Sequence, residues 1–224
     1  MPTVLAHNMG WLFYGASSTL ALSAACAVLA SAIGLTVALG QFFGGWPVRV
    51  PALAYLHLVR GTPLLVLVIG VYYVLPYTGA ELDAVSGGVI VLSFYHGAFM
   101  SEVFRGALLA VPRGQWDAGR ALGLHGFPLL WLVIIPLALR AAVPPYINSC
   151  VMLVKSTSIV SVIGLWELTL AGRQAVERTQ APFQIFAGVA AIYFMICYGL
   201  TRLGRVLEAR AARGDQLEPP RHGV

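Results

Sequence analysis

A segment from Trp11 to Leu39 contains no Asp, Glu, Lys or Arg. In an α-helix, which rises 1.5 Å per residue, it is longer than the roughly 20 residues that cross the hydrocarbon core of a bilayer. Further long apolar segments run over about Ala52–Leu75, Val85–Leu109, Phe127–Val154 and Phe183–Leu200. Because a backbone inside lipid must satisfy its own hydrogen bonds, we predict an all-α integral membrane protein with five transmembrane helices.

The composition agrees with a membrane location. Of 224 residues, 58% are hydrophobic and only 10% are charged, whereas about 25% of the residues in a soluble domain are charged. The basic residues behind the net charge of +5 flank the apolar segments, which is typical of a membrane orientation signal and not of nucleic-acid binding. Cys26, Cys150 and Cys197 lie in apolar segments without a C-x-x-C motif, so we predict packed core residues rather than disulfides or metal ligands.

Prolines and short segments modify this pattern. Pro136, Pro144 and Pro145 lie within the fourth apolar segment and predict kinks in it. The apolar segment Ile159–Ala171 is too short to cross a bilayer, so we predict a re-entrant or interfacial element there. The following stretch, Gly172–Pro182, is polar.

The distribution of basic residues predicts the orientation. Five spans put the two ends of the chain on opposite sides, and an outside N-terminus leaves nine basic residues on the cytoplasmic side and three on the outer side. The nine are Arg49, Arg105, Arg113, Arg120, Arg202, Arg205, Arg210, Arg213 and Arg221, and the three are Lys155, Arg173 and Arg178. We therefore predict an extracytoplasmic segment over 1–12, without a cleavable signal peptide, a transmembrane domain over 13–205 and a disordered cytoplasmic tail over 206–224.

A polar stretch rich in small residues follows the third apolar segment and reads DAGRALGLHGFPLLWLVIIP over 117–136. Helical spacing would put Gly119 and Gly123 one turn apart, on a face without side chains that a partner can approach closely. Asp117 is expected near the start of this helix, where the helix dipole favours a negative charge, and it can pair with Arg120 or with a cation of a partner. We interpret the stretch as a docking surface; the alternative is an ordinary loop whose glycines make turns.

This stretch resembles the E-A-A-x-x-x-G pattern, ending in I-x-L-P, of permease subunits of ATP-binding-cassette (ABC) importers, with Asp117 for Glu and Gly119 for the second Ala. The flanks LVRGTPLLVLVIGVYY, HGAFMSEVFRGALLAVPRGQWDAGRALG and LVKSTSIVSVIGLWELT are similar to the branch that imports polar amino acids. The resemblance implies the five-helix transmembrane domain of a type I importer in a bacterial inner membrane. It also implies that a cytoplasmic coupling helix contacts the ATPase through Asp117, Ala118, Gly119, Arg120 and Gly123.

The resemblance further implies the partners. These are cytoplasmic ABC ATPase subunits, an extracytoplasmic solute-binding protein, a second permease copy or paralogue, and the lipid bilayer. The sequence has no G-x-x-x-x-G-K-[ST] loop to hold ATP phosphates, so we expect no cofactor on this chain, with ATP and Mg²⁺ on the partner subunit. The expected substrate is a polar or charged amino acid, or an opine-like compound.

Polar residues inside the apolar segments are candidates for the substrate pathway, because charges in lipid are unfavourable unless they are paired or hydrated. Arg60 either binds the carboxylate of an amino acid or forms an ion pair that links the second and third spans. His96 either lines the pathway near the midplane or hydrogen-bonds to a neighbouring helix. Glu102 either lines the pathway or pairs with Arg105, three residues later, and so fixes helix geometry.

Lys155 and Thr157 belong to a K-S-T-S stretch that resembles the family's K-D-T-S, with Ser156 in place of Asp. This stretch either gates the pathway or meets the binding protein; the alternative is an N-cap for a short helix that begins near Ile159.

Two other functions remain at this point. An intramembrane enzyme would use His96 with Ser93 or Ser101, although no G-x-S-x-G motif supports it. An ion-driven transporter working alone would usually show internal repeats and more spans.

Overall fold

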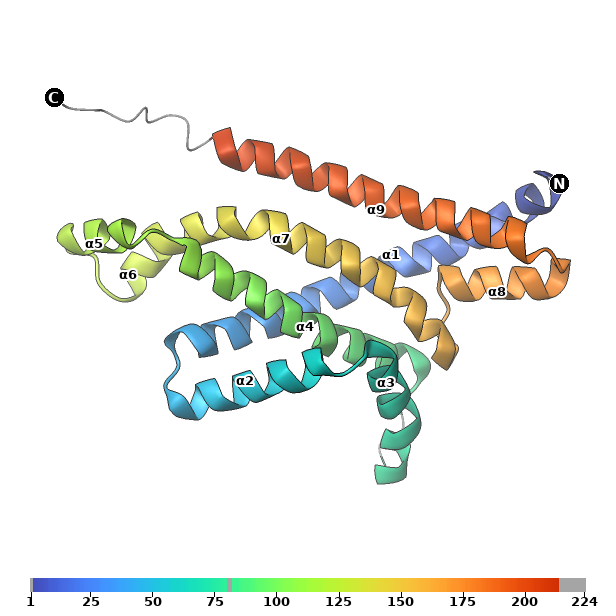
Figure 1. The fold of residues 1–224 in the computed structure, drawn as a ribbon, viewed down its shortest axis with the longest axis horizontal. Helices are drawn as coiled ribbons and strands as arrows, with labels where there is room; N and C mark the ends of the chain where they lie inside the picture. The colour runs from blue at the N-terminus through green and yellow to red at the C-terminus, as the bar shows by residue number, and fades with distance from the viewer. Residues whose placement is uncertain (1, 80–81, 214–224) are drawn as a thin grey trace.

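The computed structural model describes residues 2–79 and 82–213, and all of their regular secondary structure is helical (Figure 1). The α-helices are α1 (Pro2–Phe43), α2 (Trp46–Gly61), α3 (Leu64–Ile69), α4 (Ala84–Ala110), α5 (Arg113–Ala121), α6 (Phe127–Leu129), α7 (Ile135–Ser156), α8 (Leu168–Thr179) and α9 (Pro182–Arg213). Two π-helical segments, η1 (Gly70–Val74) and η3 (Leu130–Ile134), and two 3₁₀ segments, η2 (Leu75–Thr78) and η4 (Thr157–Ile163), connect them.

The helices form an elongated bundle with five candidate membrane crossings. In the described residues, four helical stretches are long and apolar enough to cross a membrane, and α2 with the helices that follow it makes a fifth, bent by 103°. The start of α1 and the end of α9 lie at opposite ends of the long axis (Figure 1). Helices α5 and α6 lie at the end where α1 stops, and α8 lies where α1 begins. An odd number of crossings places the start of α1 and the end of α9 at opposite ends in this way.

Helix α4 lies at the centre of the bundle and packs closely against α1. Small residues allow the close approach: a Cβ added to Gly97 would lie 2.8 Å from Cγ2 of Ile33, and one added to Gly34 would lie 2.9 Å from Cβ of Met100. Asp83 begins α4 by accepting hydrogen bonds from the backbone N–H groups of Val85 and Ser86. Hydrogen bonds from Ser86 hold the pKa of the Asp83 carboxyl below its usual value.

The second apolar segment does not form the single continuous span that we predicted over Ala52–Leu75. Its helix α2 begins earlier, at Trp46, and ends at Gly61, before Thr62 and Pro63. Proline has no N–H to donate, and its ring pushes the preceding residue out of the helical region. Thr62 accordingly has φ −108° and ψ 132°, and the chain turns there by 103° before α3.

Two helices extend across the predicted boundaries at the two ends of the chain. Helix α1 begins at Pro2, so the predicted separate segment over 1–12 is, from residue 2, part of the first helix. Helix α9 continues to Arg213, beyond the predicted domain boundary at 205. The part of the predicted tail over 214–224 lies outside the described residues.

The fourth apolar segment remains one candidate span, Phe127–Ile163. A π-helical turn, η3, ends just before Pro136, and the helix continues through Pro144 and Pro145 in α7. Local π-helical adjustment is one of the ways in which a membrane helix accommodates proline.

The stretch predicted as one short element over Ile159–Ala171 forms parts of two. The 3₁₀ segment η4 ends at Ile163, before Gly164, which has φ +78°. Helix α8 then begins at Leu168 and covers most of the stretch that we described as polar. The apolar side chains of α8, including Leu168 and Ala171, pack with Leu12 of α1 and Ile185 of α9. They are therefore buried by protein at the end of the bundle where α1 begins (Figure 1).

Glu167 fixes the start of α8. Its side chain is fully buried and accepts hydrogen bonds from the backbone N–H groups of Leu170 (2.7 Å) and Thr169 (2.8 Å). The hydroxyl of Tyr193 on α9 donates a third hydrogen bond, at 2.7 Å. Burial raises the pKa of the Glu167 carboxyl, and these hydrogen bonds oppose the increase.

Candidate functional site

The stretch that we interpreted as a docking surface forms helix α5, which lies at one end of the bundle (Figure 1). One face of α5 packs against the rest of the chain. Trp116 stacks on Phe42 of α1 with ring centroids 6.2 Å apart, and Gly119 is buried against the side chain of Leu129. A Cβ at position 119 would occupy the space of the Leu129 side chain, so Gly119 allows α5 to lie close to α6.

The two glycines do not form the common docking face that we predicted. Helix α5 ends at Ala121, and Gly123 lies beyond it with φ +81°. The N–H of Gly123 donates to the carbonyl of Arg120 (2.9 Å), and that of Leu124 donates to Gly119 (3.0 Å), which is a Schellman motif. Gly123 therefore ends the helix, as the turn alternative stated, and Gly119 faces inward.

The remaining surface of α5, formed by Asp117, Ala118 and Arg120 together with the C-cap residue Leu122, is exposed. We call it the outer face of α5. Asp117 lies in the second turn rather than near the helix start, and it pairs with Arg120 at 3.4 Å, as predicted. Leu122 has 81% of its surface exposed, and the sequence analysis missed it. The sequence pattern that could have identified Leu122 is a large apolar residue in a polar stretch, directly before the glycine that ends the helix.

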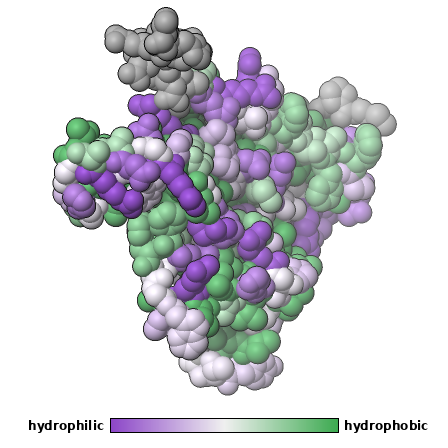
Figure 2. All heavy atoms as spheres, turned by 60° about the vertical axis from the view of Figure 1, so that its left-hand side comes forward, coloured by the Kyte–Doolittle hydropathy of each residue, from purple (hydrophilic) through white to green (hydrophobic). Residues whose placement is uncertain are grey.

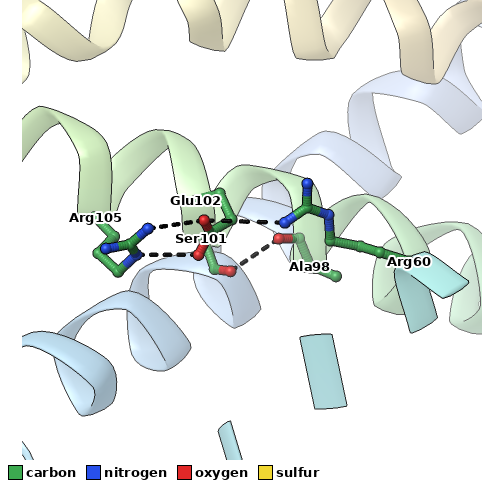
Figure 3. Close-up of polar contacts among 5 residues, drawn as sticks. All are labelled: Arg60, Ala98, Ser101, Glu102 and Arg105. Carbon is green, nitrogen blue, oxygen red and sulfur yellow. Dashed lines mark hydrogen bonds and ion pairs between the residues drawn. The ribbon is translucent and has the colours of Figure 1, made fainter. Parts of the chain in front are cut away.

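A cavity of about 810 Å³ lies between α1, α2 and α4 and collects most of the charged residues of these helices. Arg49, His57 and Arg60 line it from α2, and Glu102 and Arg105 line it from α4. Arg105 binds the Glu102 carboxylate with two hydrogen bonds, from Nε at 3.1 Å and from a terminal nitrogen at 2.9 Å (Figure 3). The predicted Glu102–Arg105 pair is therefore present and faces a large cavity.

Arg60 points from α2 toward the same carboxylate (Figure 3). Its guanidinium lies 3.9 Å from Glu102 and 5.4 Å from the ring centroid of Phe99. The interhelical ion pair that we considered thus exists, but it is long, and the Arg60 side chain remains 45% exposed. Because Arg105 already occupies both carboxylate oxygens, most Arg60 donors remain available to a ligand.

His96 lies in the interior of the bundle and does not line this cavity. Its side chain is 2% exposed, and its ring contacts those of Tyr95 and Phe99. Among the described residues, neither Nε2 of His96 nor Oγ of Ser93 has a hydrogen-bond partner. Ser101 donates to the carbonyl of Ala98 (2.8 Å), so neither serine forms the nucleophile pair that an intramembrane enzyme would need.

Lys155 and Thr157 lie elsewhere. Lys155 lines a separate hollow of about 480 Å³ between α7 and α9, together with Arg202 and Arg205. Thr157 is fully buried, and its hydroxyl donates to the carbonyl of Val154 (2.8 Å). Helix α7 continues to Ser156, whose hydroxyl donates back to Met152, so Ser156 does not form the N-cap that we considered as the alternative. Of the five pathway candidates, the structure of one chain brings only Arg60 and Glu102 together.

The comparisons with known proteins agree with this architecture. The family model described as "Binding-protein-dependent transport system inner membrane component" matches residues 11–213. The chain is 35% identical to the glutamine transport system permease protein of Escherichia coli (strain K12), over 89% of this chain and 92% of that protein. It is 33% identical to the L-cystine transport system permease protein of Bacillus subtilis (strain 168), over 91% and 86%.

A solved structure is similar over nearly the whole chain. This is a chain of an amino acid ABC transporter crystallised with histidines, which is 30% identical and has a TM-score of 0.87. The match covers 92% of this chain and 96% of that one. The chain therefore belongs to the family of binding-protein-dependent transport system inner membrane components.

Proposed function

We propose that this chain is the permease subunit of an ABC importer that takes up a polar or charged amino acid, or an opine-like compound. The observation that carries this function is the match of residues 11–213 to the family, together with relatives that are permeases for glutamine and L-cystine. As a member of this family, the chain is a multi-pass protein of the inner membrane and is not itself an enzyme. The relatives do not favour a stand-alone transporter or an intramembrane hydrolase.

The ATPase docks on the outer face of α5. An amphipathic element with one face packed on the bundle can pass a displacement into the helices that it contacts, and α5 contacts α1 through Trp116 and α6 through Gly119. Leu122 supplies an exposed apolar anchor for the partner. The excess of basic residues at this end supports its assignment to the cytoplasm, with the N-terminus outside.

The substrate crosses through the cavity between α2 and α4. Arg60 receives the substrate carboxylate, because a guanidinium binds this group through parallel, charge-assisted hydrogen bonds. A second permease copy or paralogue completes the pathway, since Lys155 and Thr157 lie outside this cavity in one chain. The binding protein docks at the other end of the bundle, near α8, and ATP and Mg²⁺ belong to the ATPase.

Reconstitution tests this function. Vesicles containing the permease and its ATPase, with binding protein outside and ATP inside, should accumulate at least one radiolabelled amino acid from a basic, acidic and amide panel. Omission of ATP, the ATPase or the binding protein should each abolish uptake. Uptake by vesicles with the permease alone would contradict the proposal and favour the stand-alone transporter.

A further inference from the structure

An apolar groove of about 500 Å³ runs along the side of the bundle between α1, α4 and the stretch from α6 to α7. Leu39 and Phe43 line it from α1, Leu108 from α4, and Trp131 and Leu139 from the third side. Every residue that lines the groove is apolar. Its volume lies within the roughly 300–1,000 Å³ of typical ligand sites.

The groove is open in the described chain and is lined by residues of candidate membrane spans. Phe43, Trp131 and Leu139 have 49%, 60% and 57% of their surface exposed. All three belong to candidate membrane spans. Inside a bilayer the surrounding solvent is hydrocarbon, so acyl chains are the first candidates to fill an apolar groove of this kind.

The surface next to the groove becomes polar and charged at α5. A second hollow, of about 370 Å³, shares the lining residue Leu108 with the groove. Trp116, Arg113 and Arg120 line this second hollow. Figure 2, in which the α5 end is turned forward, shows hydrophilic residues gathered on this end beside hydrophobic surface. Tryptophan and arginine at the end of apolar helices are typical of the headgroup level of a membrane.

The charges of the second hollow favour an anion. Arg120 is paired with Asp117 at 3.4 Å, whereas no described carboxylate lies within ion-pair distance of Arg113. Two arginines and one aspartate leave one net positive charge among the lining residues. A site with an apolar end in the membrane and a cationic end at its surface is complementary to an anionic amphiphile.

We propose that the groove and the hollow together bind one anionic phospholipid from the leaflet on the α5 side. One acyl chain occupies the groove, and the phosphate lies beside Arg113. A protein helix is a less favourable occupant of the groove than a lipid. It would bury Arg113 in an interface, where no described carboxylate pairs with its charge. The headgroup also lies beside Trp116, Asp117 and Arg120, so this site borders the outer face of α5 and leaves Ala118 and Leu122 free.

Titration followed by native mass spectrometry tests this site. The permease is purified in detergent and titrated with phosphatidylglycerol or phosphatidylcholine. The wild type should bind one phosphatidylglycerol more tightly than phosphatidylcholine. Arg113→Gln should weaken phosphatidylglycerol binding about fivefold, because one basic residue near the surface is worth about 1 kcal/mol for an anionic lipid. It should weaken phosphatidylcholine binding less, because the choline cation offsets the charge of that lipid's phosphate.

A matched pair of variants on α1 tests the groove. Leu39→Trp fills the groove and should weaken both lipids, whereas Val28→Trp, at a position 70% exposed and outside the groove, should bind both like the wild type. Phosphatidylglycerol with brominated acyl chains should quench tryptophan fluorescence less in Trp131→Phe than in the wild type. Equal lipid binding by the two α1 variants would overturn the proposal. So would a disulfide between two copies carrying Leu139→Cys, because a second copy would then cover the groove.

Discussion

Arg60 is the residue on which the proposed substrate pathway depends most. It faces a cavity of about 810 Å³, and its ion pair with Glu102 is long, at 3.9 Å. A hydrogen bond to a charged group contributes about 1.5–3 kcal/mol, so Arg60→Gln should weaken substrate binding to the solubilised transporter about 10- to 100-fold. Arg60→Lys keeps the positive charge but loses the paired hydrogen bonds of the guanidinium, so its affinity for substrate should lie between those of the wild type and Arg60→Gln. If Arg60 served only the ion pair with Glu102, Arg60→Gln would lower the melting temperature and leave the substrate-binding constant unchanged.

Glu167 should make the stability of the protein depend on pH. Burial raises the pKa of its carboxyl in the folded state, so the folded protein holds this proton more tightly than the unfolded chain does. Its contribution to stability is therefore complete below the usual glutamate pKa and is lost as the pH rises through the folded-state value. Glu167→Gln cannot titrate and should flatten the decrease in melting temperature between acidic and neutral pH.

The exposed Glu177, on the same helix α8, provides the control for this prediction. Glu177→Gln should retain the wild-type pH dependence, and an identical slope in Glu167→Gln would contradict the assignment. Sequence reasoning did not identify Glu167, because a charged residue between two apolar stretches gives no sign that the fold will bury it. Only the approach of α9, which brings Tyr193 to within 2.7 Å, reveals the role of Glu167.

At the scale of the helix, the bend between α2 and α3 separates the cavity from the end of the second crossing. Pro63 produces it by holding Thr62 in an extended conformation. Pro63→Ala should straighten this region. Spin labels at the exposed positions Leu58 and Tyr77 should then move apart toward the about 28 Å that a continuous helix of this length would span. Pro47→Ala, in the first turn of α2, should leave the distance unchanged.

Gly123 ends α5 through its backbone conformation rather than through close packing. Its φ of +81° is unfavourable for other residues, whereas nothing lies within 4 Å of a Cβ added there. Gly123→Val should therefore destabilise the end of α5 by about 1–2 kcal/mol, and Gly123→Asn should be tolerated better. ATPase binding to the two variants should follow the same order; equal loss in both would indicate a steric role for the position instead.

Helix number could be predicted from the sequence more reliably than helix shape. Lipid allows few backbone structures, so long uncharged segments predict crossings directly. Hydropathy, however, carries no information on backbone conformation. It therefore predicted one span over Ala52–Leu75, although Pro63 holds Thr62 in an extended conformation and so breaks the helix. The helix at Leu168–Thr179 was missed because its apolar residues are few and are buried by α1 and α9 rather than by lipid.

For the whole molecule, the sequence could predict the family but only part of the site. The residues near Asp117 carry the family pattern, yet the direction in which each points depends on where α5 ends and on which face packs against Phe42 and Leu129. Gly119 faces inward and Leu122 faces outward for this reason. Likewise, Lys155 and Arg60 lie in separate cavities because α7 packs against α9 while α2 packs against α4.

The account depends above all on the outer face of α5 as the place where an ATPase docks. A photo-crosslinking amino acid at Leu122, which is 81% exposed, tests this most directly in membranes that contain the complete transporter. We expect a covalent adduct with the ATPase at this position and none from the same probe at Glu177 on α8, a helix at the opposite end of the bundle (Figure 1). An ATPase adduct at Glu177 and none at Leu122 would contradict the account.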